Sequence, residues 1–302
     1  MRAQTRQVFQ VLCVLVLLAF GSFAQSIERM TTPVDVYFTD HHNFGSGFFF
    51  QQLGPFPHPD QSTPQWRLIK KLYVVTAAHV VEPEHLGNVT KFAFRFRAGG
   101  DTGSDWIEFS IPGKEFPSVL HLSPKRNVDV AVVDVTDYVN SQLLKLSAAL
   151  PPGLSLQSFA AVSEDNFPGV SKLAVAAGDD VIVVGYPRQL YDRYNKLPIL
   201  KLGLLNTPLG LRYDNLEGFL LDFRGYEGSS GSLVIGKPSN IAFDNEGRLM
   251  YSKDKEFVFL GVYSGQRYRK GRRPVTADLG LGWYYYNVQD AIDSPPVRPT
   301  TK

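Results

Sequence analysis

The 302-residue sequence has little cysteine, little net charge and no long apolar run. Its single cysteine, Cys13, excludes a framework of disulfides. Its 31 Lys and Arg nearly balance 29 Asp and Glu, so the overall charge gives no reason to expect nucleic acid or an anionic membrane as a partner. The apolar run Val11–Phe20 is well short of the ~20 residues that cross a bilayer as a helix.

The N-terminus has the parts of a secretory signal. Two arginines precede the apolar run Val11–Phe20, and Ser22 and Ala24 place small residues three and one before a cleavage point after Ala24. We expect residues 1–24 to be removed, which leaves a secreted or periplasmic protein without cysteine and without a membrane segment. The alternative is that this stretch is kept as a membrane anchor.

The remaining composition is typical of short strands joined by turns. Aromatic residues make up 13%, and 26 Gly and 20 Pro are spread along the chain. The segment Lys91–Arg97 alternates strictly and places three phenylalanines on one face, which predicts a strand with one buried side. Other apolar runs of strand length lie at residues 72–75, 128–135, 181–185, 257–263 and 283–288.

The chain divides near its middle. Tyr138–Leu150 is the best internal helix candidate, and Pro151-Pro152-Gly153 follows as a predicted connection. We therefore predict an N-terminal β unit at 25–150, a C-terminal β unit at 151–293, and a disordered tail at 294–302. Many strands at short intervals favour one or two β-barrels.

Three segments carry side chains suited to nucleophilic catalysis. His79 follows a strand that ends in the small residues Thr76-Ala77-Ala78, Asp129 lies in an otherwise apolar strand, and Ser230 lies in the loop Gly228–Gly231. A serine hydroxyl needs a base within hydrogen-bond distance, and the imidazole needs a carboxylate that fixes its tautomer. Glycines beside the serine let two N–H groups point at one oxygen position.

With these motifs in this order, the sequence resembles bacterial trypsin-like serine peptidases of the chymotrypsin clan. The matching motifs lie at 45–49, 76–79, 129–132, 185–187, 228–232 and 261–265, within residues 31–290. The resemblance implies an all-β fold of two perpendicular six-stranded β-barrels with a short C-terminal helix. It also implies that His79 is the general base, Asp129 its orienting partner and Ser230 the nucleophile. The N–H groups of Gly228 and Ser230 would form the oxyanion hole.

The resemblance also implies where substrate binds. One expected contact is the strand Tyr263-Ser264-Gly265, and another is Arg224, six residues before the nucleophile, where the family often has the base of a side-chain pocket. A guanidinium there predicts a preference for acidic residues on the acyl side of the cut bond, supported by the basic run at 267–273. The slightly favoured alternative is that Arg224 turns outward or pairs with Asp222 or Glu227 and leaves a small apolar pocket.

The expected function is that of an exported serine endopeptidase that uses no metal or cofactor and acts on peptides or proteins. The alternative is a catalytically silent protein of the same fold that binds peptides or proteins. No nucleic acid is expected as a partner, and the sequence leaves the oligomeric state open. Ser229 stands where animal digestive relatives have an aspartate that pairs with a freed N-terminus, so we do not expect activation by that route.

Two further motifs are only partial matches to a phosphate-binding loop and to a metal site. Gly231–Lys237 has the spacing of a phosphate-binding loop, but Pro238 replaces the hydroxyl residue that would hold magnesium. Asp40-His41-His42 could hold a metal, but no second group of ligands at zinc-like spacing supports it, so a solvated loop is the favoured interpretation.

Overall fold

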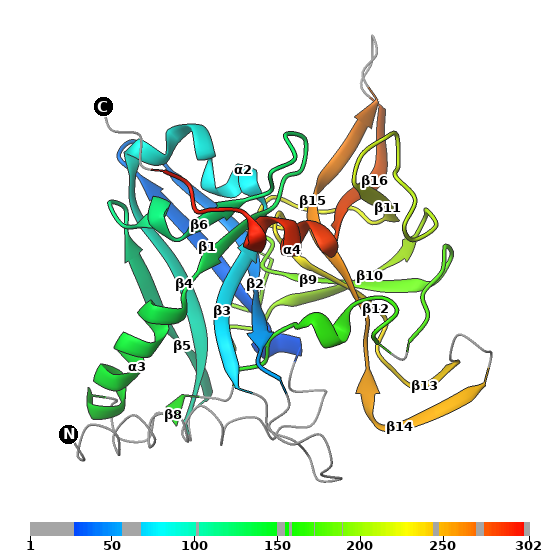
Figure 1. Cartoon of the computed structure of the whole chain (residues 1–302), viewed down its shortest axis with the longest axis horizontal. Coiled ribbons are helices and arrows are strands. Elements are labelled where there is room, and N and C mark those ends of the chain that lie inside the picture. The colour runs from blue at the N-terminus through cyan, green and yellow to red at the C-terminus, as the bar shows by residue number, and fades with distance from the viewer. Residues whose placement is uncertain are drawn as a thin grey trace.

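The computed structural model describes residues 27–55, 68–100, 103–149, 155–156, 159–171, 173–188, 190–243, 248–269 and 275–298. The predicted signal at 1–24 and the connection at 151–153 lie outside them. The described strands form two β units that lie side by side (Figure 1). Within the same ranges, every helix is too short or too polar to cross a membrane.

The N-terminal unit is an eight-stranded sheet with the order β5-β4-β1-β2-β3-β7-β6, to which β8 adds beside β4. Its strands are β1 Thr31–Phe38, β2 His42–Leu53, β3 Ile69–Thr76, β4 Val89–Gly100, β5 Gly103–Pro112, β6 Leu120–Leu122, β7 Ala131–Asp134 and β8 Ser155–Leu156. The sheet has two strands more than predicted, and its hydrogen-bonded path stays open. Because β8 pairs with β4, this unit extends past the boundary predicted at residue 150.

The C-terminal unit is a closed six-stranded barrel with the order β10-β11-β16-β15-β12-β9. Its strands are β9 Asp180–Gly185, β10 Ile199–Leu205, β11 Gly218–Asp222, β12 Leu233–Gly236, β15 Phe259–Arg269 and β16 Val275–Tyr284. A separate hairpin of β13 Ser239–Phe243 and β14 Leu249–Glu256 projects from it (Figure 1). The predicted all-β fold with a closed six-stranded barrel is confirmed.

Short helices complete the fold. They are α2 Ala78–Val81, α3 Thr136–Ala149 and α4 Tyr286–Asp293, with 3-10 turns η2 Ile27–Arg29, η3 Pro83–Asn88, η4 Phe116–Ser118 and η5 Glu164–Asn166. The predicted internal helix and C-terminal helix are thus confirmed as α3 and α4.

The alternation predicted at Lys91–Arg97 is confirmed in β4. Phe92, Phe94 and Phe96 all lie in the core of the N-terminal unit. Phe49 of β2 reaches the same core and stacks on Phe96 at 4.5 Å between ring centroids. Successive side chains on a strand point to opposite faces, so the residues on either side of Phe49 must face elsewhere.

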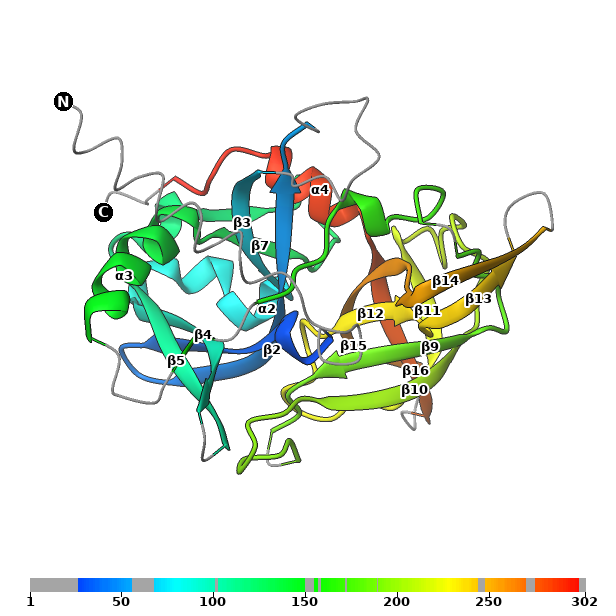
Figure 2. The same ribbon diagram turned by 90° about the horizontal axis from the view of Figure 1, so that it is seen from below.

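Those neighbours build a second core, between the two units. Phe48 and Phe50 lie there, and Phe48 meets Phe259 of the C-terminal barrel edge-to-face at 5.4 Å. Helix α4 adds Val288 and Ile292 to this core and lies against both units (Figures 1 and 2). Burial of this much apolar surface holds the two units in one arrangement, which any site between them requires.

Two predictions near the C-terminus were wrong. The run Trp283–Val288 is not one strand, because β16 ends at Tyr284 and α4 begins at Tyr286. Residues 294–298, predicted to be disordered, lie along β6: the Val297 N–H donates to the carbonyl of Leu120 at 2.8 Å. The packing of Val297 on the N-terminal core accounts for this order. Residues 299–302 lie outside the described part.

Candidate active site

The structure brings together the three side chains that the sequence selects. His79 Nδ1 lies 2.6 Å from Asp129 Oδ2, and His79 Nε2 lies 2.9 Å from Ser230 Oγ. His79 and Asp129 belong to the N-terminal unit and Ser230 to the C-terminal unit. The site therefore depends on the core between the units.

Asp129 is held by three hydrogen bonds. Its Oδ1 accepts the backbone N–H of His79 at 2.7 Å, and its Oδ2 takes the imidazole and the Ser264 hydroxyl, the latter at 2.5 Å. Donors on both of its oxygens hold the carboxylate in one orientation. The imidazole facing it is therefore held with Nδ1 as donor and Nε2 free to accept a proton from Ser230.

These contacts change the proton affinity of His79. Partial burial of the imidazole lowers its pKa, but the hydrogen bond and charge of Asp129, with the charge of Glu82, outweigh that effect. The pKa of His79 is therefore raised above the ordinary value of 6.5.

The loop that carries Ser230 needs glycine on both sides. Gly228 and Gly231 have φ angles of +86° and +85°, a region that residues with a side chain rarely adopt. A Cβ on Gly231 would also lie 2.1 Å from the Ser46 carbonyl oxygen and 2.4 Å from the Thr76 hydroxyl.

Two backbone carbonyl groups of this loop accept hydrogen bonds from other backbone N–H groups. The Glu227 carbonyl accepts the N–H of Arg188 at 2.7 Å, and the Ser229 carbonyl accepts the N–H of Ser232 at 3.1 Å. In a trans peptide the following N–H points the opposite way. The N–H groups of Gly228 and Ser230 therefore face away from these partners, as donors to an oxyanion require.

Ser46 is a site residue that the sequence analysis missed. It is fully buried; its Oγ donates to the Gly228 carbonyl at 2.7 Å and accepts the Tyr186 N–H at 2.7 Å. Its backbone N–H donates to the Ser230 carbonyl at 2.8 Å. A polar residue between two glycines, in a strand that continues as three phenylalanines, was the available signal.

The predicted substrate strand lies beside the nucleophile, but its tyrosine is covered. The Ser264 carbonyl oxygen lies 2.9 Å from Ser230 Oγ, and Gly265 continues β15 opposite Leu281. Tyr263 is only 1% exposed. A Cβ on Gly225 would lie 2.2 Å from its hydroxyl, so the ring of Tyr263 fills the space against that glycine.

Arg224 does not form the base of a pocket. Its side chain is 65% exposed, and its Nε lies 3.7 Å from Asp278 Oδ1. The outward alternative therefore describes it, although its partner is neither of the acids expected from the sequence, Asp222 and Glu227. In the basic run at 267–273, residues 270–273 lie outside the described part.

The described residues include no group of three or more His, Cys, Asp or Glu placed to share a metal ion. In the Asp40-His41-His42 motif, His41 instead bonds to Asp40 at 2.8 Å and to Glu82 at 3.1 Å.

Residues 45–239 match the family described as "Trypsin-like peptidase domain". No curated protein matches the sequence.

Similar solved structures include a scabies mite inactivated protease paralogue, at 16% identity and a TM-score of 0.44 over 90% of this chain and 99% of that one. Another is an HtrA-type protease with a tripeptide, at 12% identity and a TM-score of 0.44, covering 90% of this chain and 62% of that one. A third is a protein of M. tuberculosis in the inactive form of a serine-to-alanine mutant, at 16% identity and a TM-score of 0.41, covering 92% of each chain.

Proposed function

Because the chain belongs to the trypsin-like peptidase family, we propose that it is a serine endopeptidase that cleaves peptide bonds through an acyl-enzyme. The observation that carries the proposal is the unbroken line of hydrogen bonds from Asp129 through His79 to Ser230. A protein that only binds peptides has no need of this alignment. Membership of the family implies peptide or protein substrates.

The proposed reaction follows from this geometry. Ser230 Oγ attacks the carbonyl carbon of the peptide bond while His79 Nε2 takes its proton, and Asp129 stabilises the imidazolium. The carbonyl oxygen becomes an anion that accepts hydrogen bonds from the N–H groups of Gly228 and Ser230. When the C–N bond breaks, His79 returns the proton to the leaving amine.

Water completes the cycle. It attacks the ester carbonyl of the acyl-enzyme as His79 takes one of its protons. The second tetrahedral intermediate then collapses, the carboxylic acid leaves, and the proton returns to Ser230 Oγ. Every proton is supplied and recovered within the His79–Ser230 pair and one water.

The direct test is hydrolysis of a quenched fluorescent peptide library by the mature chain. Cleavage that is absent from a Ser230→Ala variant supports the proposal. Peptides that bind without being cleaved favour the silent alternative instead.

The buried ring of Tyr263 predicts which peptides are cleaved. We propose that the space beside Ser230, between β15 and residues 223–229, takes the side chain on the acyl side of the cut bond. Here Tyr263 lies against Gly225 and Gly280, and Phe223 meets it edge-to-face at 4.9 Å. We expect Gly, Ala and Ser on the acyl side to be cleaved at least ~10-fold faster than Phe, Leu, Glu or Arg, in a positional-scanning library.

Two variants control for this specificity. Tyr263→Ala should extend cleavage to larger residues, whereas Tyr263→Phe should leave the profile as it is. Fastest cleavage after large or charged residues by the wild-type protein would contradict this specificity and leave the endopeptidase proposal intact.

Activity should fall in acid with a midpoint above pH 6.5, because His79 must be neutral to accept a proton and its pKa is raised above that value. The measurement is kcat/KM between about pH 5 and pH 9. A Glu82→Gln variant should move the midpoint to lower pH, since the charge of Glu82 contributes to the raised pKa. A wild-type midpoint below 6.5 would contradict the assignment of His79 as the base.

We also propose that the protein is exported, on the pattern of its first 24 residues. N-terminal sequencing of the secreted or periplasmic product should begin at Gln25 or within a few residues of it. A product that stays in the cytosol and retains Met1 would contradict export.

A further inference from the structure

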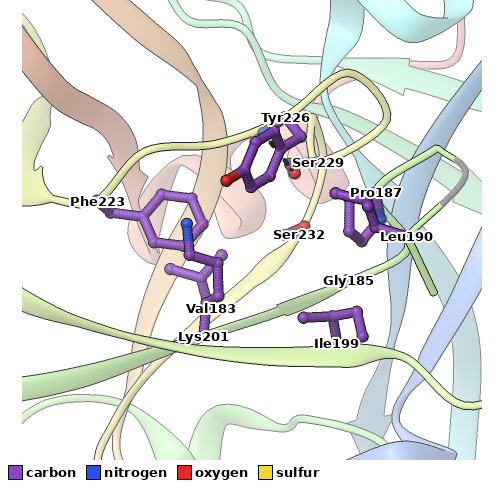
Figure 3. A pocket seen from close by; sticks show the side chains of 10 residues that line it. All are labelled: Val183, Gly185, Pro187, Leu190, Ile199, Lys201, Phe223, Tyr226, Ser229 and Ser232. Carbon is purple, nitrogen blue, oxygen red and sulfur yellow. Dashed lines mark hydrogen bonds between the residues drawn. The ribbon is translucent and has the colours of Figure 1, made fainter. Parts of the chain in front are cut away.

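A cavity of about 100 Å³ lies behind the nucleophile loop, between β9–β10 and residues 223–229 (Figure 3). Its walls are mostly apolar, and four of the side chains that line it carry a polar group: Lys201, Tyr226, Ser229 and Ser232. Ser229 and Ser232 flank the nucleophile in the sequence, but Ser230 itself does not line the cavity. The cavity therefore touches the loop and is distinct from the site where substrate reacts.

Lys201 places a positive charge against the start of this loop. Its Nζ donates to the Arg224 carbonyl at 2.5 Å and lies 4.6 Å from the ring centroid of Phe223 and 4.9 Å from that of Tyr226. Figure 3 shows the side chain directed from β10 toward these two rings. A charge-assisted hydrogen bond and two cation–π contacts together fix residues 223–226 more firmly than a neutral group would.

This constraint continues to the nucleophile. The N–H of Tyr226 donates to Ser229 Oγ at 3.1 Å, and the N–H of Ser229 donates back to the Tyr226 carbonyl at 2.9 Å. The segment held by Lys201 is thus bonded to the residue directly before Ser230. The peptide that carries the Gly228 N–H lies between these two bonded residues.

We propose that Lys201 is a positioning residue that keeps the Gly228 and Ser230 N–H groups aimed at the oxyanion. This inference rests on the proposed endopeptidase function. Lys201 touches neither substrate nor the reacting atoms and acts through residues 223–229. Because an oxyanion forms only during the reaction, loss of this positioning lowers kcat and leaves KM nearly unchanged.

Two substitutions separate the charge of Lys201 from its volume. Lys201→Met keeps most of the volume and removes the ammonium, and should lower kcat ~10- to 100-fold with KM within about threefold. Lys201→Ala removes three carbons and the nitrogen, which together are the size of n-propylammonium. Millimolar n-propylammonium should enter the open cavity and restore kcat of Lys201→Ala, with saturation.

One control replaces another lysine of the C-terminal barrel, and a second uses an uncharged ligand of the same shape. Lys237→Ala removes an exposed lysine that pairs with Asp180 at 2.7 Å, and should leave kcat unchanged. 1-Propanol, which has the shape but not the charge, should not restore Lys201→Ala. Lys201→Met should not respond to n-propylammonium, because its own side chain fills the space.

The outcomes are distinct. Restoration by the amine alone supports the proposal. A kcat of Lys201→Met equal to that of wild type, or equal restoration of Lys201→Ala by propanol, would overturn it while the endopeptidase assignment stands. If Lys201→Ala does not fold, the kcat and KM of Lys201→Met decide. A wild-type protein with no peptidase activity would overturn both.

Discussion

Replacing Ser230 by alanine should lower kcat by at least ~10⁴, and His79→Ala should have a similar effect. The His79→Ala/Ser230→Ala double variant should lose little more than either single one. In the proposed mechanism, Ser230 and His79 act in the same proton transfer across 2.9 Å, so removal of one makes the other useless. The measurement is kcat and KM for all three variants on one cleaved peptide, with folding checked by thermal unfolding.

Matched controls lie elsewhere in the same unit as the base. Ser141→Ala, on the exposed face of α3, and His121→Ala, whose Nδ1 bonds to the Ser294 carbonyl at 2.7 Å, should keep wild-type activity. Losses from His79→Ala and Ser230→Ala that multiply in the double variant would mean that the two residues act independently, contrary to the proposed mechanism.

Asp129→Asn should lower kcat by about 10³–10⁴ without unfolding the protein. An asparagine can still accept the His79 backbone N–H, but its NH₂ group faces the imidazole Nδ1 and favours the tautomer with the proton on Nε2. His79 then cannot accept the proton of Ser230. The measurement is kcat of the purified variant, together with its Tm.

The control for this effect comes from the same strand region. Asp134 closes β7, pairs with Lys71 at 2.7 Å and lies away from the site, so Asp134→Asn should leave kcat unchanged. Wild-type kcat in Asp129→Asn would show that this carboxylate does not orient the base.

The sequence was sufficient to select His79, Asp129 and Ser230. Each lies in a short motif whose residue types match one chemical role, and the three motifs have a characteristic order. The sequence does not show how far apart these motifs lie in the fold. A nucleophile, a base and a carboxylate can only work together when they are adjacent, so the chemistry itself predicts that they meet. The structure places them within hydrogen-bond distance, as that reasoning requires.

Ser46 and Lys201 could not be assigned in the same way. Their contacts are with residues more than twenty positions away, Gly228 for Ser46 and Arg224 for Lys201. A buried serine and a half-exposed lysine on strands occur in many proteins for many reasons. Only the packing of the two units and of β10 against the loop gives these two side chains their partners.

The direction of a side chain is also hard to read from sequence position. The family resemblance offers the base of a pocket for Arg224, with an outward orientation as the alternative, and the structure has the outward one, toward Asp278. The space that remained is filled by Tyr263, which fits because Gly225 and Gly280 leave room for its ring. Packing of the ring against two glycines and Phe223 decides the shape of this region, and no local motif records it.

The start of the C-terminal helix could have been read from the spacing of its apolar residues. The aromatic run at 283–286 favoured a strand through Val288, but Val288, Ala291 and Ile292 recur at the spacing of one helix face. In the structure, these three residues pack into the core between the units. Burial of that face outweighs the strand preference of the residues before it.

The most direct test of the central claim is labelling of the folded protein by a fluorophosphonate probe. The reagent reacts with a serine hydroxyl only when a neighbouring base and oxyanion donors activate it. We predict stoichiometric labelling at Ser230, identified by mass spectrometry of the modified peptide, and none in Ser230→Ala or His79→Ala. A folded wild-type protein that is not labelled, or that is labelled equally in Ser230→Ala, would contradict the account.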